Sequence, residues 1–185
     1  MPAFDEFIRR NQEFASTGDL SRLTAMPDNR VFVVTCLDPR VEPAGFLGIR
    51  TGDAIVLRNP GGRITDAVTT DIALISYMGE FMGVEGPPME IAVVHHTGCG
   101  MGFLADERFR SGFAARSGIP DAELAGRAVT DPSATVRQDV ARLLSSPLIT
   151  RRVVVSGHVL DLGSGLVTTV APAAAPATAA SEKTA

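Results

Sequence analysis

The stretch "RVFVVTCLDPR", residues 30–40, combines a strand signal with a cluster of reactive side chains. Its first part is a short, β-branched apolar run, which is typical of a strand that is buried on both faces. The run ends at Cys36, and Asp38 and Arg40 follow within four residues. A thiol, an acid and a base are therefore predicted to lie together where a buried strand ends.

Strand and helix signals alternate on both sides of this stretch. Further strands are predicted in "DAIVLRN" (53–59) and "PPMEIAVVHH" (87–96), and "RRVVVSGHVLDLGSGLVTTV" (151–170) indicates two strands joined by a turn. Helices are predicted in residues 4–15, 43–49, 65–83, 98–116 and 133–146, with Thr65 or Asp66 and Ser133 as N-caps. This alternation predicts an α/β fold, with a mostly parallel central β-sheet flanked by helices and an antiparallel edge strand near the C-terminus.

The domain organisation follows from composition along the chain. Residues 1–170 are predicted to form a single α/β domain with an N-terminal helical arm, whose Phe4, Phe7 and Phe14 make an exposed apolar stripe. Because such a stripe needs cover, we expect a homodimer or a tetramer. The last stretch, "APAAAPATAASEKTA" (171–185), is rich in Ala and Pro and is predicted to be a disordered tail.

Composition and charge exclude several classes of function. Hydrophobic residues make up 45% of the 185 residues and charged residues 21%, which is ordinary for a globular protein. The net charge of −4 provides no basic field for nucleic acid or an anionic membrane. The start of the chain has no apolar signal region and no apolar run is long enough to span a bilayer. We therefore expect a cytoplasmic protein whose two cysteines stay reduced.

The two cysteines and a nearby histidine suggest a metal site. Side chains beyond the carboxyl ends of parallel strands meet at one edge of a sheet, and three predicted strands end near Cys36, Asn59 and His96. His96 and Cys99 are separated by two residues, so one tight turn can carry both to a zinc ion. Water or the Asp38 carboxylate could fill the fourth position. The alternative is a buried core cysteine beside a plain ion pair.

Asp38 and Arg40 have the chemistry that such a site would need. Two thiolates cancel the charge of Zn²⁺ and make it a weaker Lewis acid than zinc held by three neutral histidines. A neighbouring carboxylate could orient the reacting water, and an arginine could keep that carboxylate ionised and in place. Asp38 and Arg40 are residues of these two types.

Taken together, these motifs resemble those of the β-class carbonic anhydrases. "CLDPR" is similar to the C-x-D-x-R motif of that family, "HTGC" to its H-x-x-C motif, and "RNPGG" to its R-N-A-G-G segment. "HHTGCGM" resembles a subclass that also includes carbonyl sulfide hydrolases. The resemblance covers the chain from its first helix to about residue 170. It implies Zn²⁺ ligands at Cys36, His96 and Cys99, and a catalytic pair formed by Asp38 and Arg40.

The resemblance also implies a substrate pocket, although the chain differs from the family pattern at some positions. We expect the pocket beside Asn59, Gly61, Gly62 and Gly100. The chain departs from the family pattern at Pro39, Pro60 and Gly98, and none of these changes removes a ligand. His95 is expected to be structural, although its spacing from Cys99 would also allow a metal ligand, and His158 is expected to have a surface or packing role.

The predicted activity is the reversible hydration of CO₂ to bicarbonate and a proton by a zinc lyase. Hydrolysis of carbonyl sulfide or carbon disulfide at the same site is an alternative, because the motifs do not separate these substrates. A second alternative is a closed zinc site without turnover, with Asp38 as a permanent fourth ligand.

Overall fold

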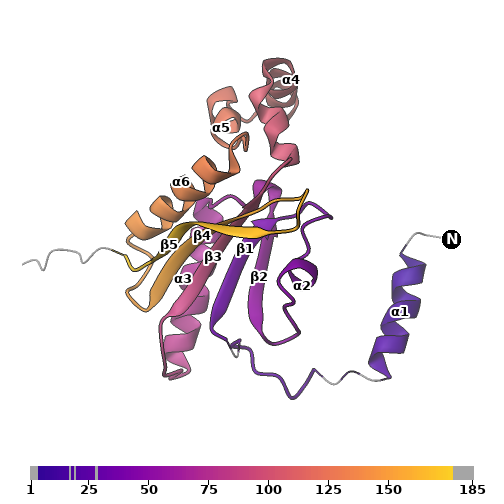
Figure 1. The fold of residues 1–185 in the computed structure, drawn as a ribbon, viewed down its shortest axis with the longest axis vertical. Coiled ribbons are helices and arrows are strands. Elements are labelled where there is room, and N and C mark those ends of the chain that lie inside the picture. Colours follow the sequence, from indigo (N-terminus) through magenta and orange to yellow (C-terminus); the bar gives the residue numbers. More distant parts are fainter. Residues whose placement is uncertain (1–3, 17, 19, 28, 177–185) are drawn as a thin grey trace, which may run out of the picture.

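Five strands form one sheet in a computed structural model of the protein, which describes residues 4–16, 18, 20–27 and 29–176. They are β1 (Val31–Cys36), β2 (Ala54–Asn59), β3 (Met89–His96), β4 (Val153–Leu160) and β5 (Val167–Ala174). The spatial order is β2-β1-β3-β4-β5 (Figure 1). All neighbouring pairs are parallel except β4 and β5, so the predicted parallel sheet with an antiparallel edge strand is confirmed.

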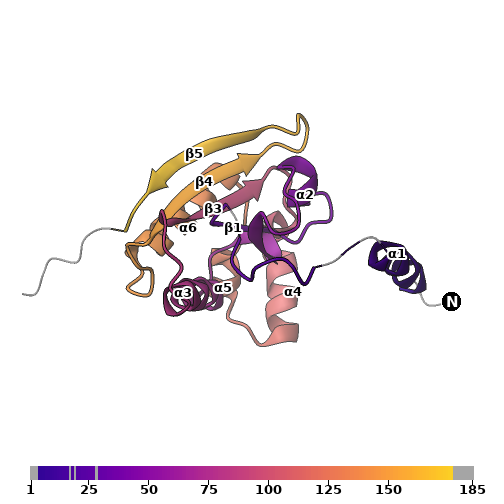
Figure 2. The same ribbon diagram turned by 90° about the horizontal axis from the view of Figure 1, so that it is seen from below.

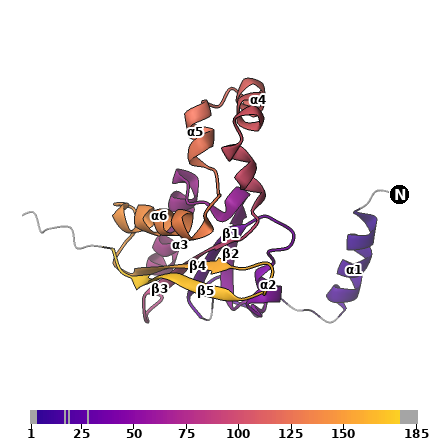
Figure 3. The same cartoon turned by 45° about the horizontal axis from the view of Figure 1, so that its top comes forward.

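Helices cover the sheet unevenly. They are α1 (Asp5–Ala15), α2 (Pro43–Phe46), α3 (Asp66–Phe81), α4 (Glu107–Ser117), α5 (Asp121–Gly126) and α6 (Pro132–Ser145). Helices α3 and α6 lie on one face and the short α2 on the other, while α4 and α5 project beyond the sheet (Figures 2 and 3). Only α5 has no counterpart among the predicted helices, because six residues are too few for a periodic signal.

Two helix starts show how capping works here. The Thr65 side chain accepts a hydrogen bond from the backbone N–H of Val68, which makes Thr65 the N-cap of α3. For α6 the predicted cap Ser133 is wrong. Asp131 caps that helix by accepting from the backbone of Ser133 and Ala134, because Pro132 occupies the first helical position.

The core is divided by the sheet. The larger cluster packs between the sheet and α3 and α6, and includes Phe32, Ile72, Ile91 and Leu143. A smaller cluster lies on the opposite face around Val33, Val41, Val94 and Leu160. Alternation along β3 therefore sends Ile91, Val93 and His95 to the α6 side, and Val94 and His96 to the other side.

The C-terminal boundary differs from the predicted one. Strand β5 runs to Ala174, which pairs with Val155, and Ala171 pairs with Gly157. The prediction of a disordered tail from residue 171 is therefore wrong for 171–174. Backbone groups make the ladder, so a segment of small side chains can still join an edge. The part of the predicted tail from 177 to 185 lies outside the described residues.

Helix α1 stands apart from the rest of the molecule (Figure 1) and contributes no buried residue. Phe4, Phe7 and Phe14 are 66%, 55% and 47% exposed, so about half or more of each side chain in the predicted apolar stripe is accessible to solvent. Within the described ranges, none of the helices combines the length and apolarity needed to cross a membrane.

Candidate metal centre

Three strand ends meet at the carboxyl edge of the sheet. Cys36 and Asn59 are register partners at the ends of β1 and β2, and His96 ends β3. Cys99 follows in the turn after β3 and immediately precedes the 3₁₀ segment Gly100–Ala105. The parallel order β2-β1-β3 is what brings side chains from distant parts of the sequence to one place.

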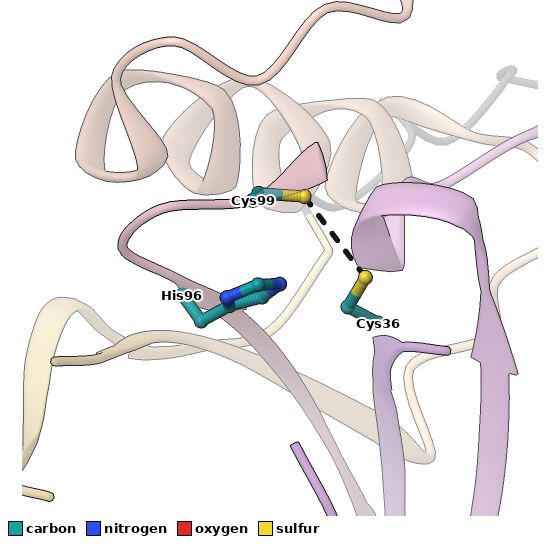
Figure 4. Close-up of side chains that lie close together, drawn as sticks. All are labelled: Cys36, His96 and Cys99. Atoms are coloured by element: carbon teal, nitrogen blue, oxygen red, sulfur yellow. Dashed lines mark hydrogen bonds between the residues drawn. The ribbon is translucent and has the colours of Figure 1, made fainter. Parts of the chain in front are cut away.

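The two thiols and the imidazole of His96 converge in space (Figure 4). One ligand atom from each of Cys36, His96 and Cys99 lies within 4.8 Å of the other two. The sulfurs are 3.9 Å apart, which is too far for a disulfide. A tetrahedral zinc ion with Zn–S distances of about 2.3 Å would hold two sulfurs about 3.8 Å apart. The observed separation fits that requirement.

His96 provides a second test of whether a metal fits. Its Nδ1 donates to the Thr97 carbonyl at 2.9 Å, so in the neutral ring Nε2 carries a lone pair. Among the buried side-chain nitrogens and oxygens of the described residues, only this Nε2 and Ser76 Oγ have no hydrogen-bond partner. An orphaned imidazole nitrogen beside two sulfurs is the arrangement that a metal ion would complete.

The electrostatics of the cluster also favour a cation. The hydrogen bond with the Cys99 thiol is the main reason why the pKa of Cys36 falls to about 4, against an opposing effect of burial. The same contact, with burial, raises the pKa of Cys99, because a second thiolate beside the first is disfavoured. Burial lowers the pKa of His96, but the Cys36 thiolate outweighs it and raises that pKa. Without a cation the site therefore resists carrying two thiolates.

Asp38 faces Arg40 in a tight turn. The Val41 N–H donates to the Asp38 carbonyl at 2.9 Å, which makes residues 38–41 a β-turn with Pro39 at its second position. Arg40 donates to both carboxylate oxygens, from Nε at 2.9 Å and from Nη2 at 2.6 Å. These bonds from Arg40 hold the pKa of Asp38 well below its usual range. Arg40 Nη2 also donates to the Gly98 carbonyl at 3.1 Å, which links the two motifs.

Arg58 of β2 holds the backbone of the same turn. Its Nε donates to the Cys36 carbonyl at 3.0 Å and its Nη2 to the Asp38 carbonyl at 2.9 Å, while Nη1 pairs with Glu42. The sequence placed Arg58 at a strand end without giving it a role. The structure shows that it fixes the segment between the first cysteine and the acid.

A cavity of about 260 Å³ opens beside the thiols. Its walls are Cys36, Leu37, Asp38, Pro39, Pro60, Gly61, Cys99, Gly100 and Met101. Gly61 and Gly100 were predicted there. Asn59 and Gly62 were predicted there too, but they do not line this cavity. The Asn59 amide bonds the backbone of Arg63, and Gly62 is buried against Cys36, so both shape the loop behind the wall.

The other two histidines have complete sets of partners. His95 Nδ1 lies 3.0 Å from Thr135 Oγ1, and Nε2 lies 3.2 Å from the Gly62 carbonyl. His158 contacts Thr169 Oγ1 and Ser156 Oγ through its two ring nitrogens. Neither belongs to the Cys36, His96 and Cys99 cluster.

Comparisons with known proteins agree with this geometry. Residues 31–112, which contain both cysteine motifs, match a family model described as carbonic anhydrase. Over 172 residues the chain is 30% identical to β-carbonic anhydrase 1 of Mycobacterium tuberculosis, which covers 93% of this chain and 100% of that protein. The chain belongs to the β-carbonic anhydrase family. The resemblance noted in the motifs is thereby confirmed over most of the chain.

Two further relatives have different named activities. The crystal structure of carbonic anhydrase from Streptococcus mutans superposes with a TM-score of 0.76 at 34% identity, covering 92% of this chain and 98% of that one. Carbon disulfide hydrolase of Saccharolobus solfataricus is 39% identical over 105 residues, which is 56% of this chain and 46% of that protein. Family membership therefore leaves the substrate open.

Proposed function

We propose that this protein is a zinc-dependent carbonic anhydrase, which hydrates CO₂ reversibly to bicarbonate and a proton. The observation that carries the proposal is the convergence of the Cys36, His96 and Cys99 ligand atoms next to an arginine-held carboxylate. The similarity to β-carbonic anhydrase 1 of Mycobacterium tuberculosis over nearly the whole chain supports it.

Cys36, His96 and Cys99 would hold the metal ion. Their donor set of two sulfurs and one imidazole is one that zinc favours, and three protein ligands leave a fourth position for water. When bound, zinc would supply the Lewis acidity that brings the pKa of water toward neutrality. The backbone N–H of Asp38 donates to Cys36 Sγ at 3.4 Å and would support that ligand from outside the metal sphere.

Asp38 and Arg40 would govern the reacting water. Asp38 stays ionised because Arg40 donates to both of its oxygens, and an ionised carboxylate can accept a hydrogen bond from the water and orient its lone pair. The β-turn around Pro39 would keep the carboxylate beside the cavity without further reorganisation. Orientation, rather than nucleophilic attack by a side chain, is the role proposed for this pair.

The cavity suits a small apolar substrate. Leu37, Pro39, Pro60 and Met101 line its walls together with Gly61, and none of these side chains offers a charge to the substrate. A linear triatomic molecule without net charge fits such walls, because most of the contacts that they offer are apolar.

A second candidate function is hydrolysis of carbon disulfide or carbonyl sulfide at the same site. The 39% identity to carbon disulfide hydrolase of Saccharolobus solfataricus and the apolar cavity walls both support it. The pairing of Asp38 with Arg40 argues against the other alternative, a closed site without turnover, because both carboxylate oxygens are already bonded to Arg40 and Asp38 does not belong to the group of converging ligand atoms.

Stopped-flow measurement of CO₂ hydration by the zinc-loaded protein tests the proposal. We expect rapid hydration by the wild type, and about a 10²-fold lower kcat in Asp38→Asn, which loses the ionised acceptor but keeps the three ligands. Cys36→Ser serves as the control, and a wild-type rate no higher than the rate of this control would refute the proposal. The ratio of kcat/KM for CO₂, carbonyl sulfide and carbon disulfide on one preparation decides between the two candidates.

We further propose that α1 mediates association into a homodimer or tetramer. Phe4 and Phe7 are 66% and 55% exposed on a helix that has no buried residue, which supports a second chain as their cover. Light scattering at micromolar concentration that gave only the monomer mass would contradict this. The cytoplasmic location stays a prediction.

A further inference from the structure

A buried carboxylate on α6 lies directly behind the metal centre. Asp139 is 2% exposed, and Arg63 donates to its two oxygens, from Nε at 2.8 Å and from Nη2 at 3.2 Å. Arg63 Nη1 also donates to the carbonyls of Gly126 and Ala128. The guanidinium therefore joins α6 to the last residue of α5 and to the segment after it, with most of its donors engaged.

The same carboxylate reaches two further elements. Asp139 Oδ2 accepts from the backbone N–H of Ile64 at 3.2 Å, and His95 Nε2 lies 3.3 Å from it. His95 Nε2 also contacts the Gly62 carbonyl at 3.2 Å. Asp139 therefore contacts both the loop after β2, through Ile64, and strand β3, through His95. His95 is the residue immediately before the proposed ligand His96.

The loop held in this way presses against Cys36. Gly62 has a left-handed φ of +66°, and a Cβ atom at this position would come within 3.0 Å of the Cys36 nitrogen. Gly61 has a φ of +81°, and a Cβ there would come within 3.1 Å of Met101 in the cavity wall. Both glycines are needed because L side chains rarely adopt this backbone conformation and have no room here. Movement of the loop would therefore displace the backbone of Cys36 and the cavity wall at Met101.

A buried ion pair is a weak way to stabilise a fold, because desolvation offsets much of the attraction between the charges. The Asp139 network nevertheless occupies the space between α6 and the loop. Apolar side chains of similar volume at these positions would stabilise the fold equally well. Each of its bonds ends on a group next to the site: Arg63 and Ile64 in the loop, and His95 beside a ligand. This placement indicates that the network contributes precision of geometry to the site, in addition to any effect on stability.

We propose that Asp139 is a positioning residue of the metal centre: through Arg63 and His95 it fixes the loop of residues 59–64 against Cys36. The spacing of the Cys36 and Cys99 sulfurs, and hence the retention of zinc, depends on that loop. The part that concerns zinc rests on the proposed function. The part that concerns the sulfur spacing does not, because it describes the protein without metal.

The test compares Asp139→Asn with Ser156→Ala as a matched control. Ser156 is also 2% exposed, and its replacement by alanine removes partly buried hydrogen bonds to Glu90 and His158, in a network outside the candidate metal site. Transfer of zinc from each loaded protein to a chromophoric chelator measures retention. We expect zinc affinity about tenfold weaker in Asp139→Asn and unchanged in Ser156→Ala, since partners beyond the ligands typically contribute 10- to 100-fold.

A readout on the metal-free protein separates this inference from the proposed function. A short bifunctional thiol reagent bridges the two cysteines rapidly when the sulfurs stay 3.9 Å apart. We expect slower bridging in Asp139→Asn than in the wild type and in Ser156→Ala. If Asp139→Asn does not fold, Arg63→Lys replaces it, because lysine keeps the charge but cannot bond both carboxylate oxygens in parallel. Wild-type zinc affinity and wild-type bridging in the folded variant would overturn the proposal, whereas failure of CO₂ hydration alone would leave it standing.

Discussion

His95 and His96 are neighbours on β3, and both are almost completely buried, yet their surroundings differ in kind. His95 points toward α6, where Thr135, Gly62 and Asp139 surround its two ring nitrogens. His96 points to the other side, and its Nε2 has no partner. Burial alone cannot separate a structural histidine from a metal ligand. The difference lies in whether the protein itself completes the hydrogen bonds of the ring.

Removal of His96 should produce the largest effect. We expect His96→Ala to lose stoichiometric zinc, because two thiolates alone make an incomplete site, and to lower kcat/KM by about 10³-fold, or about 4 kcal/mol of transition-state stabilisation. Metal analysis and stopped-flow kinetics measure both quantities. Full zinc content in His96→Ala would show that His96 is not a metal ligand.

Removal of His95 should act on stability instead. His95→Ala leaves Thr135 and Asp139 each without one buried partner, and we expect a loss of about 2–4 kcal/mol in the free energy of unfolding. At micromolar concentration the folded variant should still carry one zinc per chain, because all three proposed ligands remain. Urea unfolding and metal analysis test this. A variant of native stability that lacks zinc would contradict it.

His158 offers a finer and smaller test, because its ring nitrogens are also satisfied but it is only partly buried. Burial lowers the pKa of His158, and the charge of Glu90 opposes that shift without reversing it. Protonation therefore favours the unfolded chain, whose histidine has a pKa of about 6.5. We expect its stabilising contribution to be complete above that pH and to decline below it, toward the folded pKa.

Urea unfolding of the wild type and of His158→Gln between pH 5 and 8 measures this contribution. The stability difference in favour of the wild type should shrink as the pH falls, and by less than the effect at His95. A stability difference between the two proteins that is constant from pH 5 to 8 would show that protonation of His158 does not affect folding.

Several features were predictable because they depend on local chemistry. The β-branched run before Cys36, the Thr65 cap and the turn between the last two strands are encoded within a few residues, and the structure agrees with each. The errors came from competition between neighbours. Asp131 displaced Ser133 as a cap because Pro132 follows it, and an alanine-rich segment joined the sheet through its backbone.

The sequence by itself determined the class of fold, the family and the set of side chains available at the carboxyl edge, because strand periodicity and motif spacing are short-range properties. Only the tertiary structure decided which of these side chains meet. It placed the ligand atoms of Cys36, His96 and Cys99 within 4.8 Å of one another, and it directed the Asn59 amide to the backbone of Arg63 instead of the cavity. It also brought Asp139, 40 or more residues from either cysteine, behind the site. Contacts of that kind depend on how α6 packs on the sheet, and no local pattern encodes them.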